Sequence, residues 1–327
     1  MFFKNKKVLV TGGSGFIGSH LVKYLVRQKA KVSVTVKYNS IIDNIRLHNY
    51  WNKIYVIESD LRNLDSILKF NKQKFDIIFH LAAYNHVGDS FGNYQESISS
   101  NLVSTCNLIE YGPFSKKFIY MSTSEVYGKQ FSVPFDEKNT PHPISPYSIS
   151  KYAGELYTQM FKTISKNPKN RIFNICRAFN TFGPYQSEKA VIPEIINKAL
   201  SNHDILATKG KQTREFNYID NIIDGVTKLS MLDKTLNNTI NIGCGNDVKI
   251  KDLIHKILKL TNSKSKLYLG GLKERPTEIY EMRAKNTLAK KYLKWKPQIS
   301  FDQGLMNTIE WYKKYKKFYD YYGEILD

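Results

Sequence analysis

The chain has 327 residues, 42% of them hydrophobic, which suffices for a sizeable core in one large domain or two modest ones. Its 49 Lys and Arg against 29 Asp and Glu give a formal net charge of +20, and no apolar run approaches the roughly 18 residues of a membrane span. Three distant cysteines without Cys-x-x-Cys spacing argue against a zinc site and against a disulfide framework.

The first half of the chain alternates strand and helix patterns. The predicted strands are 7–10, 31–36, 54–58, 75–80, 118–121 and 172–177. The predicted helices between them are 15–27, 64–70, 96–111 and 147–164. Continuous apolar strands that alternate with helices predict an α/β fold, a Rossmann-like doubly wound parallel sheet covered on both faces. Ligands of such sheets bind beyond the carboxyl ends of the strands, so functional residues are expected just after each strand.

The first predicted strand ends in a glycine-rich turn, Thr11-Gly12-Gly13-Ser14-Gly15-Phe16-Ile17-Gly18, which opens into an amphipathic helix. In this context one glycine permits the tight turn, one lets the backbone approach a pyrophosphate, and one lets helix and strand pack closely. The N-terminus of the helix offers unpaired N–H groups to phosphates. We therefore predict a dinucleotide site that includes Gly12, Gly15, Phe16, Ile17 and Gly18.

The second predicted strand ends without the Asp or Glu that usually holds the ribose 2′-hydroxyl of NAD, about 20 residues beyond the glycines. Lys37 stands there instead, with Asn39 and Ser40 close behind it. These three side chains can accept a 2′-phosphate, whereas Lys37 can equally be a solvated surface charge. The choice between NAD and NADP stays open.

Two further strand ends carry residues that suit a cofactor. Asp60 and Leu61 follow the third strand, where Asp60 can accept from an adenine amino group or pair with Arg62 at the surface. The fourth strand ends in His80-Leu81-Ala82-Ala83, and Leu81, Ala82 and Ala83 would let a cofactor ribose approach the backbone. His80 closes an apolar strand, so we interpret it as structural rather than catalytic.

Hydroxyl groups and a carboxyl follow the fifth strand, in Ser122-Thr123-Ser124-Glu125, and Pro146 opens the next helix. Tyr147 and Lys151 are four residues apart and therefore share one helical face. A protonated lysine beside a tyrosine hydroxyl favours the phenolate and lowers a pKa that is ordinarily about 10. Tyr147 is therefore a candidate general base that Lys151 activates.

Together these motifs resemble the extended short-chain dehydrogenase/reductases, the NAD(P)-dependent nucleotide-sugar epimerases, dehydratases and decarboxylases. The T-G-x-x-G-x-x-G turn is matched by Thr11, Gly12, Gly15 and Gly18, and the Y-x-x-x-K pair by Tyr147 and Lys151, with Thr123 beside them. Asp60, the His-Leu-Ala-Ala stretch and Arg177-x-x-Asn180-x-x-Gly183-Pro184 also fit, within residues 6–311. The resemblance implies NAD or NADP retained through the cycle, a nucleotide-diphosphate sugar as substrate, and a homodimer through helices 96–111 and 147–164.

Glu125 distinguishes reactions within this family. By resemblance, 4,6-dehydratases and glucuronate decarboxylases carry an acid at this position, and epimerases generally do not. In the dehydratases Tyr147 would take the proton of the sugar 4-hydroxyl as the C4 hydride passes to the nicotinamide. Glu125 would then remove the C5 proton, water would leave from C6, and the hydride would return to C6. Alternatively, Glu125 supports another side chain of the site without reacting itself, or it is an acid exposed to solvent.

Ser124 departs from one branch of the family, because the dTDP-glucose dehydratases carry there an Asp thought to protonate the leaving hydroxyl. Ser124, still counted among the catalytic candidates, cannot be a comparable acid. Thr-Ser-Glu resembles the GDP-mannose and legionaminic-pathway dehydratases more closely, and the segment 140–148 resembles the dehydratase segment before the catalytic Tyr more than that of the decarboxylases. UDP-glucuronate decarboxylases share Thr-Ser-Glu and are the runner-up, followed by a 4-epimerase or 4-dehydrogenase. All these reactions oxidise C4, so Thr123, Tyr147 and Lys151 keep their roles in each.

The second half of the chain resembles the substrate region of these enzymes. Asn180, Val191 and Ile192 fall in segments that line the nucleotide-sugar site. Arg214 and Arg275 match positions that contact the diphosphate or ribose, for which the planar guanidinium fork is suited; a surface ion pair is the alternative. A late strand in 239–245 is expected to return to the sheet. The predicted division is a dinucleotide-binding domain of 1–180, with 217–245 returning to it, and a smaller mixed α/β substrate lobe of 181–216 and 246–327.

The positive charge permits two interpretations, a nucleic-acid surface or a solvated surface whose field favours a phosphate-bearing substrate. The lysines are scattered, and only 311–317 mixes them with aromatic residues, where stacking on bases competes with a packed helix. We favour the packed helix and expect no nucleic-acid or membrane partner and no metal. A non-catalytic nucleotide- or RNA-binding relative is the remote alternative. The charged residues 1–7 leave no room for a signal peptide, so a cytoplasmic enzyme is expected.

Overall fold

The computed structural model describes residues 1–38, 46–163, 171–236, 239–274 and 278–323, and its centre within these ranges is a seven-stranded sheet. The strands are β1 (Lys7–Thr11), β2 (Lys31–Val36), β3 (Ile54–Glu58), β4 (Lys74–His80), β5 (Phe114–Thr123), β6 (Ile172–Ala178) and β11 (Ile240–Ile242). They lie in the order β11-β6-β5-β4-β1-β2-β3, and every neighbouring pair is parallel. The predicted doubly wound parallel sheet is confirmed.

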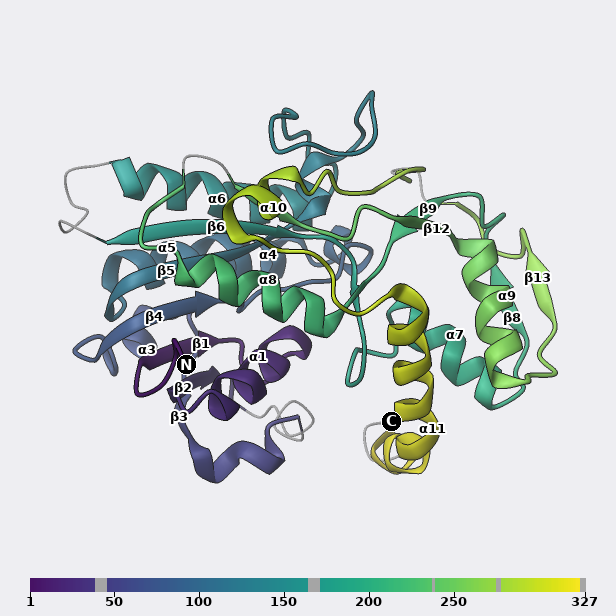
Figure 1. Ribbon diagram of the computed structural model, residues 1–327, viewed down its shortest axis with the longest axis horizontal. Helices are drawn as coiled ribbons and strands as arrows, with labels where there is room; N and C mark the ends of the chain where they lie inside the picture. Colours follow the sequence, from purple (N-terminus) through teal and green to yellow (C-terminus); the bar gives the residue numbers. More distant parts are fainter. Residues whose placement is uncertain (39–45, 164–170, 237–238, 275–277, 324–327) are drawn as a thin grey trace.

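Helices cover both faces of this sheet, because successive side chains of a strand point to opposite faces and here both faces are apolar. Val8 and Val10 of β1 belong to one buried cluster, whereas Leu9 belongs to another. The first cluster is covered by α1 (Phe16–Arg27) and α8 (Ile219–Met231), which contact each other and lie side by side in Figure 1. The second is covered by α3 (Leu64–Leu68), α5 (Ser104–Tyr111) and α6 (Pro146–Thr163).

The helix predicted at 96–111 is interrupted. The structure has α4 (Tyr94–Ile98), then a π-helical turn, η3 (Ser99–Val103), and then α5. The hydroxyls of Ser104 and Thr105 donate to the carbonyl oxygens of Ser100 and Asn101, at 2.5 and 2.6 Å. Such side-chain bonds compete for carbonyl groups that a regular helix would use. Turns of this kind often mark functional sites.

A smaller group of elements lies beyond the carboxyl ends of the strands. Its strands are β7 (Thr181–Phe182), β8 (Ile205–Ala207), β9 (Thr213–Glu215), β10 (Asn217–Tyr218), β12 (Asp247–Lys249) and β13 (Leu267–Leu269), paired as β10-β7, β12-β9 and β13-β8. Its helices are α7 (Val191–Leu200), α9 (Ile250–Thr261) and α11 (Phe301–Gly323), whereas α10 (Thr287–Leu293) packs against α8 and β11 beside the main sheet. Figure 1 shows α7, α9, β8 and β13 together at one end of the molecule. Short helical turns η1 (His48–Lys53), η2 (Asp89–Phe91) and η4 (Ser124–Tyr127) complete the described elements.

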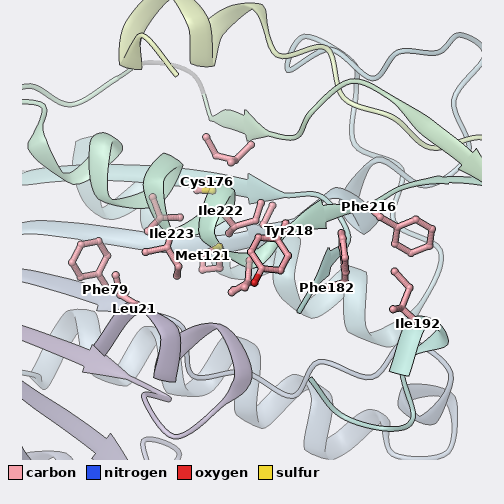
Figure 2. Close-up of a cluster of buried hydrophobic side chains, with 14 of the residues drawn as sticks. Leu21, Phe79, Met121, Cys176, Phe182, Ile192, Phe216, Tyr218, Ile222 and Ile223 are labelled. Atoms are coloured by element: carbon pink, nitrogen blue, oxygen red, sulfur yellow. The ribbon is translucent and has the colours of Figure 1, made fainter. Parts of the chain in front are cut away.

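The sheet and this lobe share one buried cluster. Figure 2 shows side chains that run from Leu21 and Phe79, beside the sheet, to Phe182, Ile192 and Phe216 in the lobe. The strand expected within 239–245 is β11, which pairs with β6, so the chain crosses into the lobe and back. The limits of the two predicted domains within this continuous core stay a prediction.

The C-terminal helix packs its aromatic residues. The ring of Trp311 lies 4.6 Å from that of Tyr185, and the hydroxyl of Tyr312 donates to the carbonyl oxygen of Gln186 at 2.7 Å. These contacts support the packed-helix interpretation of this segment over the stacking of bases. None of the helices in the described ranges is long and apolar enough to span a bilayer.

Candidate active site

A cavity of about 490 Å³ lies at the carboxyl ends of the central strands. Most of the predicted site residues line it: Gly12, Gly15, Phe16, Ile17, Gly18, Lys37, Asp60, Leu61, Leu81, Ala82, Ala83, Thr123, Ser124, Glu125, Tyr147, Lys151 and Asn180. These positions come from the ends of six strands and the starts of two helices. The parallel sheet therefore brings candidate cofactor-binding and catalytic residues to a single site.

Several predicted substrate residues lie away from this cavity. Val191 packs against the core and Ile192 is buried in it, while the guanidinium of Arg214 pairs with Glu278 at 2.5 Å. An ion pair of this kind is the alternative to phosphate or ribose binding that the sequence left open for Arg214. Asn39, Ser40 and Arg275 lie outside the described residues. A role in substrate or cofactor binding stays a prediction for all six.

The glycine-rich turn is tightly packed. Gly12 has φ +64°, and a Cβ there would lie 2.8 Å from the backbone of Ala82 in the neighbouring strand end. A Cβ on Gly18 would lie 2.2 Å from the carbonyl oxygen of Gly12, whereas one on Gly15 would meet only that oxygen, at 3.2 Å. Gly12 and Gly18 therefore shape the turn, and Gly15 leaves space on its open side.

Gly18→Ala is expected to lower the free energy of unfolding by about 1–3 kcal/mol, because the added methyl group meets backbone rather than a flexible side chain. Affinity for NADH or NADPH should fall with it, since the turn must shift. Urea unfolding and fluorescence titration measure the two effects. Gly92→Ala is the matched control, because its nearest neighbour would be 3.9 Å away. Parental stability and affinity in Gly18→Ala would contradict the role given to this glycine.

A hydrogen-bonded chain ties this turn to the neighbouring strand end. The hydroxyl oxygen of Thr11 accepts from the N–H groups of Leu81 and Ala82, both at 3.1 Å, and lies 2.8 Å from Nδ1 of His80. Nε2 of His80 lies 2.9 Å from the hydroxyl of Thr105. That hydroxyl donates its own hydrogen bond to the carbonyl oxygen of Asn101 in η3, so towards His80 it can only accept. We therefore assign the His80 proton to Nε2. Burial lowers the pKa of His80 to about 3, which supports a structural, neutral imidazole.

A charged network forms one rim of the cavity. Nε of Arg62 donates to Oδ1 of Asp60 at 2.9 Å, and its Nη1 donates to Glu96. Lys37 pairs with Glu96 at 3.3 Å. Hydrogen bonds from Arg62 hold the pKa of Asp60 below its ordinary value. Sequence reasoning placed Asp60 and Lys37 here but missed Glu96, which is 34 residues from Arg62 and carries no motif of its own.

The expected activation of Tyr147 by Lys151 requires a correction. Burial raises the pKa of Tyr147 to about 12; a hydrogen bond with Thr123 acts in the opposite direction, and the charge of Glu125 raises it further. Lys151 is 3% exposed, and burial lowers the pKa of its amine to about 7. The lysine is therefore only partly charged at neutral pH. The helical spacing is present, but burial outweighs the charge effect inferred from it.

Three consecutive residues at the end of β5, Thr123 to Glu125, differ in their surroundings. Thr123 caps η4 by accepting from the N–H of Glu125 at 3.2 Å. The hydroxyl of Ser124 is buried and donates to the sulfur of Met282 at 3.3 Å. Glu125 is half-buried, lines the cavity and acts electrostatically on Tyr147. This carboxyl is therefore near the candidate base, and Ser124 faces the substrate lobe.

Asn101 supports the catalytic helix and was missed by sequence reasoning. Its amide oxygen accepts from the N–H of Tyr84 at 2.8 Å, and its amide nitrogen donates to Ser150 at 2.9 Å. Ser150 in turn donates to the carbonyl oxygen of Tyr147 at 2.9 Å. The π-helical turn is thus joined to the start of α6. The run of serines, Asn and Thr in 97–105, unusual for a helix, was the available signal.

The residues of the cavity fit a bound dinucleotide. Helix α1 begins at Phe16, and its N-cap residue Gly15 has no side chain to bond the first N–H groups, so these are available to a pyrophosphate. Leu81 and Ala82 give an apolar wall, and Asp60 with Lys37 gives a polar rim. Within the described part of the chain, no group of three His, Cys, Asp or Glu is placed to hold a metal ion.

Comparison with known proteins finds similarity over nearly the whole chain. The family model for GDP-mannose 4,6-dehydratase matches residues 9–308. Human dTDP-D-glucose 4,6-dehydratase is 32% identical over 325 residues, covering 94% of this chain and 90% of the relative. A UDP-N-acetyl-alpha-D-glucosaminuronate decarboxylase of Bacillus cytotoxicus is 31% identical, covering 94% and 98%.

One solved structure with the same fold is the UDP-glucuronic acid 4-epimerase of Bacillus cereus, in complex with UDP-glucuronic acid and NAD. It superimposes with a TM-score of 0.84 at 28% sequence identity and covers 94% of this chain and 99% of its own. The names of these three proteins describe three different reactions on nucleotide sugars. The similarity therefore narrows the chemistry to this substrate class without choosing among the reactions.

Proposed function

Because the chain belongs to the GDP-mannose 4,6-dehydratase family, we propose that it is a nucleotide-sugar 4,6-dehydratase that makes a 4-keto-6-deoxy sugar. The observation that carries this proposal is the presence of Glu125 in one cavity with Thr123, Tyr147 and Lys151. Oxidation at C4 needs a base for the hydroxyl proton, and elimination needs a second base near C5. Tyr147 and Glu125 supply these two bases.

The proposed cofactor is NAD or NADP, retained through the catalytic cycle. Gly12, Gly15 and the start of α1 would hold its pyrophosphate, and Leu81, Ala82 and Ala83 would contact a ribose. When bound, the nicotinamide accepts a hydride from C4 of the sugar and gives it back at C6. Asn180, which also lines the cavity, is proposed to bind the sugar or its diphosphate.

Proton transfer in the proposed reaction falls to two side chains. Tyr147 takes the proton of the sugar 4-hydroxyl, with Thr123 as the hydrogen-bond partner of its oxygen. The resulting ketone acidifies the C5 proton, which the carboxylate of Glu125 removes.

The leaving 6-hydroxyl also needs a proton. Ser124 is bound to Met282, and the carboxylates of Asp60 and Glu96 are bound to Arg62. Of the carboxyl groups that the structure describes in the cavity, Glu125 is the one beside Tyr147, and it has just been protonated. We therefore propose that Glu125 returns the proton to O6, so that water leaves and the carboxylate is regenerated. When the hydride returns to C6, C5 takes up one proton, which balances the proton that Tyr147 removed from the 4-hydroxyl.

Mass spectrometry tests the proposal. The purified protein is incubated separately with a panel of nucleotide hexoses and UDP-uronates, without added reductant. Loss of one water from a hexose nucleotide is the expected result, and it also names the substrate. Loss of carbon dioxide from a UDP-uronate would make the protein a decarboxylase, as its Bacillus cytotoxicus relative is named. A new epimer of unchanged mass would overturn the dehydratase assignment as well.

The proposed oligomer is a homodimer through α4, α5 and α6. These helices pack together and leave Ile98, Ile149, Leu156 and Met160 more than 40% exposed. Light scattering is expected to show a dimer for the parent and a monomer for Leu156→Arg, because a two-fold interface would bury the new charge twice. Leu206→Arg, in the substrate lobe and 49% exposed, is the control that should stay dimeric. A dimeric Leu156→Arg would exclude this face.

A further inference from the structure

A buried carboxylate follows the two candidate catalytic residues on the same helix. Tyr147, Lys151 and Glu155 are spaced four residues apart along α6, so they form one row on its inner side. Glu155 is 0% exposed. It lies outside the cavity lining, and the proposed reaction gives it no role.

Arg177 of β6 holds this carboxylate in a fixed position. Its Nε donates to Oε1 of Glu155 at 3.0 Å, and its Nη2 donates to Oε2 at 2.7 Å. The guanidinium lies 4.6 Å from the ring centre of Tyr127, whose hydroxyl donates to Asn241 of β11 at 2.7 Å. A bidentate pair of hydrogen bonds from a buried guanidinium that lies over an aromatic ring fixes the position of the carboxylate.

Lys151 lies between this pair and the cavity. It is buried, and its amine lies 4.4 Å from the ring centre of Tyr120, whose hydroxyl donates to the carbonyl oxygen of Lys151 at 3.1 Å. In the part of the chain that the structure describes, no hydrogen bond or ion pair is made by this amine. Burial lowers its pKa, and the one charge that acts against burial is that of Glu155.

The titratable groups around Lys151 and Glu155 come from four elements. They are Tyr147 and Glu155 from α6, Tyr120 from β5, His80 from β4, and Cys176 with Arg177 from β6. Tyr120 and Cys176 are held neutral at ordinary pH because burial raises the pKa of each. His80 is neutral because burial lowers its pKa to about 3. Within this group, Glu155 is the residue whose charge favours a protonated lysine.

We propose that Glu155 and Arg177 form a positioning pair for the reaction: Glu155 favours the protonated form of the buried Lys151 amine, and Arg177 holds Glu155 in place. This inference rests on the proposed function only in that a protonated Lys151 favours the phenolate of Tyr147. The electrostatic part of it concerns the folded chain alone and is measurable without substrate or cofactor.

The first experiment measures the charge of Lys151 through folding stability. The free energy of unfolding is determined by urea titration from pH 5.5 to 10 for the parent and for Lys151→Met, and the difference between them is plotted against pH. Lys151 has a lower pKa in the folded than in the unfolded chain, so the unfolded state binds more protons between the two values. The parent should gain stability relative to Lys151→Met as pH rises, starting near pH 7.

The same difference is then measured with Glu155→Gln in both chains. The onset of the rise is expected to move to lower pH by about one unit or more, because an opposite charge nearby has been removed. Glu155→Asp, which keeps the charge, should retain an onset near the parental one. If Glu155→Gln does not fold, the double variant Glu155→Gln, Arg177→Met removes both buried charges and is expected to show the same shift. An unchanged onset in the folded variant would overturn the proposal.

The second experiment asks whether this charge affects the reaction. The kcat on the nucleotide sugar is measured as a function of pH. As pH rises, the kcat of Glu155→Gln is expected to fall at a lower pH than that of the parent or of Glu155→Asp. A shifted stability onset with an unchanged kcat profile would reduce the pair to a structural element. If the parent turns over no nucleotide sugar, the proposed function fails in that assay, whereas the coupling of Glu155 to Lys151 is still decided by the first experiment.

Discussion

Replacement of Tyr147 by Phe is expected to lower kcat on the nucleotide-sugar substrate by a factor of about 10² to 10⁴, the usual contribution of one general acid–base group. Phe keeps the ring and its packing but has no oxygen to take the proton of the 4-hydroxyl. Burial holds the pKa of Tyr147 well above neutrality, so a substrate and its cofactor must supply part of the stabilisation of the phenolate. Single-turnover mass spectrometry measures the loss.

Tyr152→Phe is the matched control for this variant. Tyr152 lies on the same helix, packs against the small cluster around Val126 and Tyr127, and does not line the cavity. Its kcat should equal that of the parent, and both variants should bind NADH or NADPH as the parent does. More than about a tenth of parental kcat in Tyr147→Phe would be incompatible with its role as the base.

Replacement of Glu125 by Gln is expected to block the second half of the reaction and leave the first half working. The amide has the shape of the acid but cannot take the C5 proton, so dehydration should slow by about 10² to 10⁴. Loss of the carboxylate also removes a charge that raises the pKa of Tyr147, so oxidation at C4 should not be slowed. Borodeuteride trapping of a quenched single turnover should therefore find a 4-keto sugar that retains its 6-hydroxyl.

Glu137→Gln controls for the loss of a carboxylate as such. Glu137 is outside the cavity lining and accepts the N–H of Asn241 at 2.9 Å, which an amide oxygen can also do. Dehydration by Glu137→Gln should match that of the parent. Parental dehydration in Glu125→Gln would show that another group removes the C5 proton, and with it the dehydratase proposal would lose its main support.

The fold and most of the cavity could be predicted because both depend on local pattern. Short runs rich in β-branched and apolar residues predict strands, and 31–36 and 54–58 became β2 and β3 with the predicted bounds. In a parallel sheet the residues that follow the strands must converge, which is why Gly12, Asp60 and Thr123 could be grouped from the sequence pattern alone.

Contacts across long sequence separations and the effects of burial could not be predicted in this way. Arg62 meets Glu96 from 34 residues away, and Arg214 meets Glu278 from 64, with no pattern that links either pair. The pKa of Tyr147 follows from burial, which the spacing of Tyr147 and Lys151 does not report. The π-helical turn likewise depends on hydroxyl groups that bond to the backbone instead of facing water.

The pairing of β11 with β6 has a consequence for how the protein is made. The last strand of the sheet, β11, ends at Ile242. When only the first 180 residues have been synthesised, the sheet therefore lacks this edge strand. Until β11 arrives, β6 presents unpaired N–H and C=O groups, the kind of edge at which chains aggregate. The dinucleotide half, expressed without β11, would therefore expose this edge of its sheet. Its sheet is complete only after the first segment of the substrate lobe, with α7, β8 and β9, has also left the ribosome.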